Sequence, residues 1–199
     1  NENSYIRYVD QMVFELVCKM IQESIQKGMK MVPISFNLSK ASFEDEPFMQ
    51  EYMEVFQQFD IPKEYIEFEL LESISMDNSD KLIKVVDTIH KAGFRCALDD
   101  FGSGYSSMSV LARVPIDIIK LDRSLFQNPY RDIDKFLIVD GLLDILHHFP
   151  VQIVAEGVED ETVAEHMRQD GCDMIQGFYY YRPMPMDEFQ RLIAEQGEC

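Results

Sequence analysis

Two adjacent aspartates, Asp99 and Asp100, end a short apolar stretch in the segment RCALDDFGSGYSSM (residues 95–108). Neighbouring carboxylates repel each other and add nothing to a hydrophobic core, so the pair needs another partner. Asp99 is the last inward position of the predicted strand, and Asp100 is predicted to begin a loop that turns its side chain back. One carboxylate then bridges two cations and its neighbour holds only the second. Two cations about 3.5–4 Å apart suit an in-line displacement at phosphorus.

The chain around this pair alternates between helical and strand periodicity. Helices are predicted at residues 4–28, 41–59, 79–92, 105–113, 131–148, 160–170 and 186–196. Strands are predicted at residues 31–39, 66–72, 94–99, 117–122, 151–156 and 172–177. This alternation is typical of βαβ units and a parallel sheet.

Two α/β architectures fit this pattern, an open doubly wound sheet and a (β/α)8 barrel. A doubly wound dinucleotide site calls for GxGxxG after the first strand, and the sequence has none there. A barrel needs roughly 250 residues and eight strands. We therefore predict a TIM-like barrel formed as one domain, residues 1–199, with its first strand or strands lying upstream of residue 1.

Side chains alternate between two faces along each predicted strand. One face is apolar throughout, with Phe36, Phe68 and Leu98 as examples. The other face ends, strand by strand, in Asn37, Glu69, Asp99, Lys120, Glu156 and Gln176. The carboxyl ends of barrel strands share one rim, where active sites are built. Carboxylate and amide oxygens suit Mg²⁺ or Mn²⁺, and a lysine there neutralises phosphate charge.

These residues resemble the EAL-domain cyclic-di-GMP phosphodiesterases along almost the whole chain. FNLS resembles the family's VNxS strand end and implies Asn37 as a metal ligand. ELLES resembles its ExTES motif and implies Glu69 as a metal ligand and Glu72 as a loop-stabilising residue. DDFGSGYSS is similar to its most diagnostic segment, which implies Asp99 as the bridging ligand and Asp100 as a second-metal ligand.

Three later motifs continue the resemblance. KLDRS implies Lys120 as the catalytic lysine with Asp122 as its companion on the substrate side. AEGVE implies Glu156 as a metal ligand or base and Glu159 as its support. QGFYYYRPMP is similar to QGxxxxxPxP and implies that Gln176 lies near the substrate. The resemblance further implies hydrolysis of cyclic di-GMP to pGpG with two Mg²⁺ or Mn²⁺ ions, a homodimer, and an upstream sensor or diguanylate cyclase domain.

Two departures keep other functions open. The chain begins downstream of the Glu-Ala-Leu motif, whose Glu is a metal ligand in the family, and Leu71 replaces the Thr of ExTES. One alternative is therefore a catalytically silent sensor that binds cyclic di-GMP. A further alternative, which rests on the spacing of the rim residues alone, is a metal-dependent barrel enzyme of carbon chemistry, in which a lysine base works beside an enolate held by Mg²⁺.

Composition limits the partners and the compartment. With 18 basic against 36 acidic residues the formal net charge is −18, which opposes binding to polymeric nucleic acid. The four cysteines show no CxxC spacing, which fits a reducing compartment better than a disulfide framework. No apolar run reaches the about 18–20 residues that a membrane helix needs. We therefore expect a cytoplasmic protein. All four histidines fall on predicted helices without a ligand partner at suitable spacing, so we interpret them as surface or interface residues.

Overall fold

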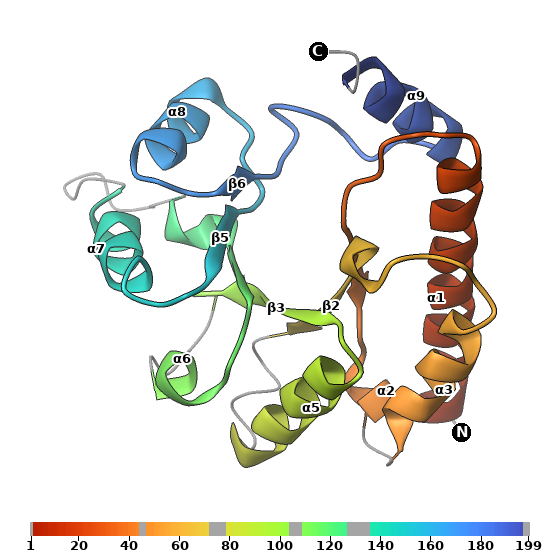
Figure 1. The fold of residues 1–199 in the computed structure, drawn as a ribbon. Helices are drawn as coiled ribbons and strands as arrows, with labels where there is room; N and C mark the ends of the chain where they lie inside the picture. Colours follow the sequence, from red (N-terminus) through yellow and green to blue (C-terminus); the bar gives the residue numbers. More distant parts are fainter. Residues whose placement is uncertain (1, 44–46, 72–78, 104–108, 127–135, 197–199) are drawn as a thin grey trace. The chain divides into compact units, whose positions relative to one another are not determined.

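The computed structural model describes residues 2–43, 47–71, 79–103, 109–126 and 136–196 (Figure 1). Its strands form one sheet in the order β1-β2-β3-β4-β5-β6, and the strand pairs with a described register are parallel. The strands are β1 (Ile34–Asn37), β2 (Ile66–Leu71), β3 (Arg95–Phe101), β4 (Ile118–Leu121), β5 (Gln152–Ala155) and β6 (Met174–Ile175).

Helices alternate with these strands, as the sequence predicts. They are α1 (Glu2–Gln26), α2 (Lys40–Phe43), α3 (Phe48–Phe56), α5 (Ser79–Lys91), α6 (Ser109–Arg113), α7 (Leu137–Leu146), α8 (Glu161–Gln169) and α9 (Met186–Gln196). Two short 3-10 helices are η1 (Lys63–Tyr65) and η2 (Arg123–Leu125). The single helix predicted at 41–59 is wrong. Pro47 stands immediately before α3, and a proline lacks the N–H that an unbroken helix would need there.

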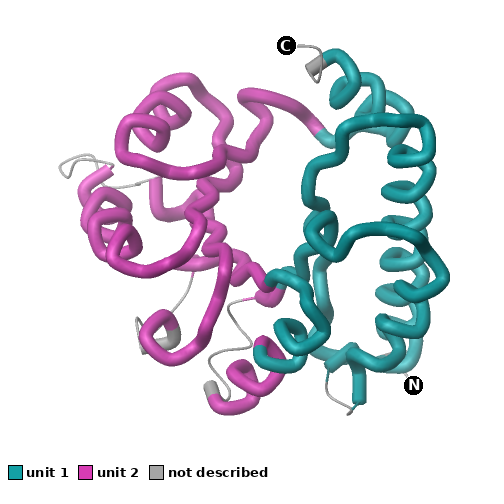
Figure 2. The backbone as a smooth tube through the Cα atoms, in the orientation of Figure 1, with its two compact units in different colours: residues 1–69, 87–95, 183–199 teal, residues 70–86, 96–182 magenta. Residues whose placement is uncertain are grey.

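The chain divides into two compact units (Figure 2). Unit 1 comprises residues 1–69, 87–95 and 183–199, and it contains α1, α2, α3, β1, α9 and most of β2. Unit 2 comprises residues 70–86 and 96–182, and it contains β4, β5, β6, α6, α7, α8 and nearly all of β3.

The core of unit 1 is aromatic. Phe14 of α1, Phe36 of β1, Tyr52 of α3 and Phe68 of β2 pack with ring centroids 5.0–5.8 Å apart. Most of these pairs meet edge to face, the geometry that aromatic quadrupoles favour. Phe36 and Phe68 belong to the strand face predicted to be apolar, so that prediction is confirmed in this unit.

Unit 2 is built on the same alternation of strand faces. The predicted apolar positions Leu98, Ile119 and Ile153 are buried. On the opposite face, Ala97, Ile118 and Val154 form a second buried cluster. Since Asp99, Lys120 and Glu156 follow these three residues two positions later, they continue this opposite face.

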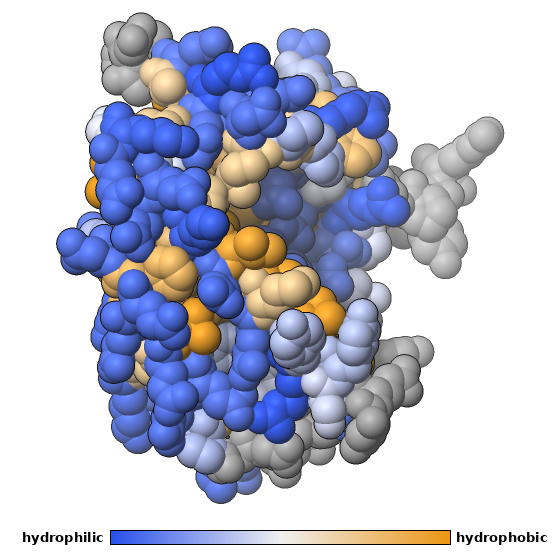
Figure 3. All heavy atoms as spheres, turned by 90° about the vertical axis from the view of Figure 1, so that its right-hand side faces the viewer, coloured by the Kyte–Doolittle hydropathy of each residue, from blue (hydrophilic) through white to orange (hydrophobic). Residues whose placement is uncertain are grey.

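The face drawn in Figure 3 is mostly hydrophilic and carries hydrophobic patches. Exposed apolar side chains of α1 include Tyr5, Tyr8 and Leu16. Among the described helices, none combines the length and the apolar character needed to cross a membrane.

Two glycines of unit 2 give a matched test of this packing. A Cβ on Gly177 would lie 2.0 Å from the carbonyl oxygen and 2.4 Å from the amide nitrogen of Val158, whereas a Cβ on Gly141 in α7 would meet nothing within 4 Å. We expect Gly177→Ala to destabilise the fold by about 1–3 kcal/mol or more, because backbone atoms cannot move aside cheaply. Gly141→Ala should be neutral or stabilising by up to about 1 kcal/mol. Urea unfolding of both variants measures the difference, and equal effects would contradict the packing described.

Candidate active site

The adjacent residues Asp99 and Asp100 form a β-bulge. Leu98 of β3 pairs with Ile119 of β4, and Phe101 pairs with Leu121. Two residues of β3, Asp99 and Asp100, therefore lie opposite the single residue Lys120, which is how a bulge is defined. The prediction that the strand ends at Asp99 is wrong, because β3 continues to Phe101.

Asp100 has the backbone conformation that this bulge requires. Its φ of 57° lies in the left-handed region, which aspartate tolerates better than most residues other than glycine. Gly102 follows with a φ of 91°, also in the left-handed region, which glycine adopts readily. The amide N–H of Asp100 donates a hydrogen bond of 2.9 Å to Oδ1 of Asp99. The bulge thus brings together two carboxylates that regular pleating would point to opposite faces.

Three carboxylates converge at the end of this strand face. Oxygen atoms of Asp99, Asp100 and Glu156 all lie within 4.8 Å of one another. The ammonium group of Lys120 lies 2.5 Å from Oε1 of Glu156 and 3.5 Å from Oδ1 of Asp99. These side chains are largely buried, with exposed fractions of 8% for Lys120, 13% for Asp99 and 16% for Glu156. Low solvent access strengthens every charge interaction among them.

Burial changes the acidity of Glu156. It raises the pKa of this carboxyl from 4.5 to about 7, while Lys120 opposes the shift and Asp99 adds to it. A carboxyl group with a pKa near neutrality can accept or release a proton at physiological pH. The arrangement therefore contains a group suited to proton transfer next to a fixed cationic group.

The carboxylate cluster is suited to hard cations. Its ligand atoms are carboxylate oxygens, which Mg²⁺ and Mn²⁺ prefer over imidazole or thiolate ligands. The backbone bulge brings the Asp99 and Asp100 oxygens close to those of Glu156. The residues present thus fit the predicted metal site.

A pocket of about 290 Å³ adjoins the cluster in unit 2. Its wall contains the predicted residues Asp122, Glu156, Glu159 and Gln176. Sequence reasoning missed its other lining residues, Arg123, Gly157, Gly177 and Phe178. The pocket thus combines carboxylates, one guanidinium group, one amide and an aromatic ring.

Local structure explains how the pocket wall is held. The carboxylate of Asp122 accepts a hydrogen bond of 3.0 Å from the N–H of Ser124 and caps η2, which places Arg123 at the start of that turn. Arg123 pairs with Glu159 at 3.4 Å, and both side chains are exposed. The guanidinium of Arg182 lies 4.6 Å from the ring centroid of Phe178. The sequence feature that could have identified Arg123 as a pocket residue is its place in the KLDRS motif, directly after Asp122.

Two predicted ligands, Asn37 and Glu69, belong to unit 1. They are register partners at the carboxyl ends of β1 and β2. Glu69 is buried and Asn37 is exposed. Glu72, predicted to stabilise a loop, lies outside the described residues.

Unit 1 also contains a charged pair that sequence reasoning missed. Glu67 is buried on the same strand face as Glu69, where Arg95 donates a hydrogen bond of 2.7 Å to it and Ser35 one of 3.4 Å. The sequence does indicate that Glu67 lies on the same face as Glu69, because the two are two residues apart in IEFEL and such residues share one face of a strand. Pairing with Arg95 offsets the cost of burying the Glu67 carboxylate.

Comparison with known proteins identifies the family. The sequence profile of the EAL domain matches residues 1–183. The chain belongs to the EAL domain family. Signaling protein YkoW of Bacillus subtilis is 29% identical over 98% of this EAL chain, which spans 24% of that protein. Cyclic di-GMP phosphodiesterase PdeB of Shewanella oneidensis is 32% identical over 82% of the chain, which spans 20% of PdeB. The EAL chain thus covers between a fifth and a quarter of the length of these relatives.

A solved structure agrees with this assignment. The structure described as "PaMucR Phosphodiesterase, c-di-GMP complex" superposes on the EAL chain with a TM-score of 0.86 at 27% identity, over 94% of this chain and 76% of that one. Together with the parallel sheet in sequence order, this likeness confirms the predicted fold class, an α/β fold of the EAL type.

The raised pKa of Glu156 can be tested in the metal-free EAL chain. We expect its carboxyl to titrate at about pH 7, followed by the NMR shift of its carboxyl carbon. Because the folded state binds this proton more tightly than the unfolded chain, the carboxyl stabilises the fold at low pH, and this contribution is lost as the pH rises through about 7.

Two substitutions are expected to move this pKa in opposite directions. Asp99→Asn should lower it by removing a like charge, and Lys120→Met should raise it by removing the neighbouring cation. A titration at the ordinary value of 4.5 that neither substitution changes would show that the carboxyl is solvated.

Proposed function

We propose that this EAL domain hydrolyses cyclic di-GMP to linear pGpG with two divalent cations, Mg²⁺ or Mn²⁺. The observation that carries the proposal is the Asp99–Asp100 bulge, whose carboxylates meet Glu156 and Lys120 in a largely buried cluster. PdeB, named as a cyclic di-GMP phosphodiesterase, and the PaMucR complex with c-di-GMP support the same activity for this chain.

In this proposal both carboxylates of the bulge are metal ligands. Asp99 and Asp100 would both hold cations there, and the left-handed backbone at Asp100 brings its carboxylate to the same site as that of Asp99. When bound, the cations supply Lewis-acid stabilisation of the charge that develops on the attacking and leaving oxygens. Asn37 and Glu69 are proposed as further ligands on the strength of the family resemblance.

Lys120 and Glu156 are the proposed catalytic side chains of the protein itself. The Lys120 ammonium group donates hydrogen bonds toward negative charge, which is what a phosphodiester gains as it is attacked. Glu156 accepts a proton from the attacking water, and its pKa of about 7 suits a base that works near neutral pH. Each group stabilises the other before substrate arrives, because their charges are opposite and adjacent.

The adjoining pocket supplies substrate contacts. Gln176 and Asp122 are proposed to contact the substrate, and Arg123 can pair with a phosphate oxygen in place of Glu159. Until then Glu159 holds Arg123 through their ion pair. The ring of Phe178 offers a flat surface for a guanine base.

A second function is a catalytically silent sensor of cyclic di-GMP. Leu71, in the position where the family motif has Thr, follows Glu69 by two residues and has an exposed fraction of 41%. An apolar side chain beside a proposed metal ligand removes a hydroxyl that could hold a ligand or water in place. In that case the domain binds the nucleotide and does not cleave it.

Product analysis distinguishes these functions. We expect cyclic di-GMP incubated with the protein and Mn²⁺ to yield pGpG on chromatography, and Asp99→Asn, Lys120→Met and Glu156→Gln each to slow turnover by about 100-fold or more. Asp87→Asn, which breaks an exposed ion pair with Lys91, should leave turnover unchanged. Leu71→Thr should increase it.

The assay is run on the 199-residue chain and on a form extended upstream through the family's Glu-Ala-Leu strand. Absence of product from both forms, with nucleotide binding retained by calorimetry in the presence of Ca²⁺, would support the sensor. Absence of both product and binding would contradict both functions.

A further inference from the structure

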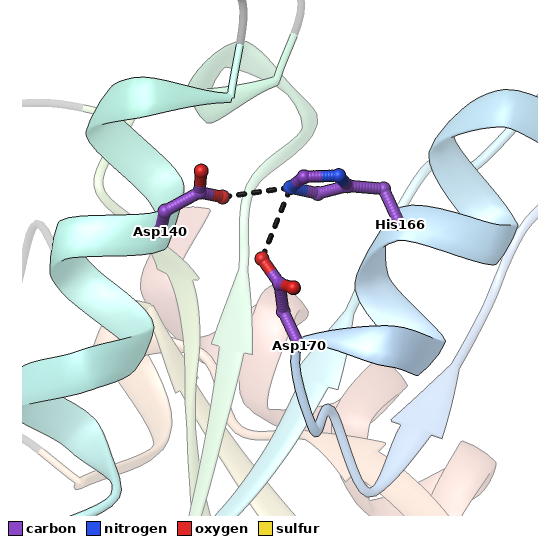
Figure 4. Close-up of side chains that lie close together, drawn as sticks. All are labelled: Asp140, His166 and Asp170. Atoms are coloured by element: carbon purple, nitrogen blue, oxygen red, sulfur yellow. Dashed lines mark hydrogen bonds and ion pairs between the residues drawn. The ribbon is translucent and has the colours of Figure 1, made fainter.

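The outer helices of unit 2 carry a second cluster of metal-ligating side chains. Nε2 of His166 lies 2.7 Å from Oδ1 of Asp140 and 3.0 Å from Oδ2 of Asp170. Figure 4 shows both carboxylates pointing at this one nitrogen, Asp140 from α7 and Asp170 from the end of α8. The prediction that the histidines lack a partner at suitable spacing is wrong for His166, because Asp170 lies one helical turn away on the same face.

A single ring nitrogen cannot serve two carboxylates well as a neutral imidazole. Nε2 then carries either one N–H or one lone pair, so at most one carboxylate receives a well-directed hydrogen bond. A cation at the meeting point would instead bind the nitrogen lone pair and both oxygens. Ligands about 2.1 Å from one metal ion are separated by roughly 3.0–3.4 Å, so the observed separations need to open only slightly.

The imidazole is already held in a fixed plane. The ring of Phe136 stacks on it with centroids 3.6 Å apart and an angle of 9° between the planes. Stacking limits rotation of the ring and keeps Nε2 directed at the carboxylates. Fixing a ligand in advance lowers the entropic cost of binding an ion.

Charge and access favour a cation at this cluster. Two carboxylates outweigh a single imidazole, so the three groups together are negative whether or not His166 is protonated. Their side chains have exposed fractions of 25% for His166, 40% for Asp140 and 33% for Asp170. A hydrated ion can therefore reach them and keep water at the remaining coordination positions.

We propose that Asp140, His166 and Asp170 bind a divalent transition-metal ion such as Zn²⁺, which ties α7 to α8. One nitrogen and two carboxylate oxygens match the ligands that Zn²⁺ takes in proteins, with water completing the coordination. The imidazole makes the site selective against Mg²⁺, which prefers an all-oxygen environment. This site is separate from the Asp99–Asp100–Glu156 cluster and does not depend on the proposed activity.

Calorimetric titration with Zn²⁺ in millimolar Mg²⁺ tests the site through stoichiometry. We expect wild type to bind one more equivalent of Zn²⁺ than His166→Gln, or to bind that equivalent at least about tenfold more tightly. His148→Gln is the matched control, since His148 is exposed and contacts only the Asp144 carbonyl oxygen among its described hydrogen-bond partners. It should bind Zn²⁺ as wild type does.

A second measurement keeps the test independent of folding defects. Asp170→Asn retains the imidazole and its ring stacking, and it should show the same loss of Zn²⁺ binding with an unchanged circular dichroism spectrum. In wild type, Zn²⁺ should also shift the NMR resonance of His166 Nε2 and raise the thermal unfolding midpoint. Equal Zn²⁺ binding by wild type and both variants, or no Zn²⁺ effect on His166, would overturn the proposal in favour of a plain ion pair.

Discussion

Neighbouring residues of a β-strand point to opposite faces, so two adjacent aspartates reach one point only where the strand is irregular. Here the irregularity lies between β3 and β4, where Asp99 and Asp100 together face Lys120. The left-handed backbone at Asp100 makes this possible, and a short polar side chain tolerates it. The candidate site in unit 2 depends on this bulge, because Lys120 and Glu156 meet its two carboxylates from the next two strands.

Ion pairing stabilises part of the cluster, whose three carboxylates outnumber its one ammonium group. A buried ammonium group is costly unless it is paired, and Lys120 has Asp99 and Glu156 within 3.5 Å. Burial is also costly for the Glu156 carboxylate, and it raises the pKa of this group to about 7. The groups that stabilise one another in the folded chain are therefore the groups that the proposed hydrolysis uses.

Periodicity predicted much of the fold, because burial of Phe36, Phe68 and Leu98 follows directly from strand alternation. It also placed Asp99, Lys120 and Glu156 on one face. Periodicity could not predict the bulge, since nothing in two adjacent aspartates specifies a positive φ. Long-range contacts were missed for the same kind of reason: His166 meets Asp140 across 26 residues, and Arg123 enters the pocket through the turn that Asp122 caps. Such pairs depend on how elements pack, which periodicity does not determine.

The most direct test of the proposed metal site is a crystal structure of the protein soaked in Mn²⁺, with anomalous scattering used to locate the bound ions. We predict anomalous peaks for two ions held by Asp99 and Asp100 beside Glu156, with Asp100 still in the left-handed conformation. A structure with no peak at the bulge, or with β3 regular through Asp99 and Asp100, would contradict it.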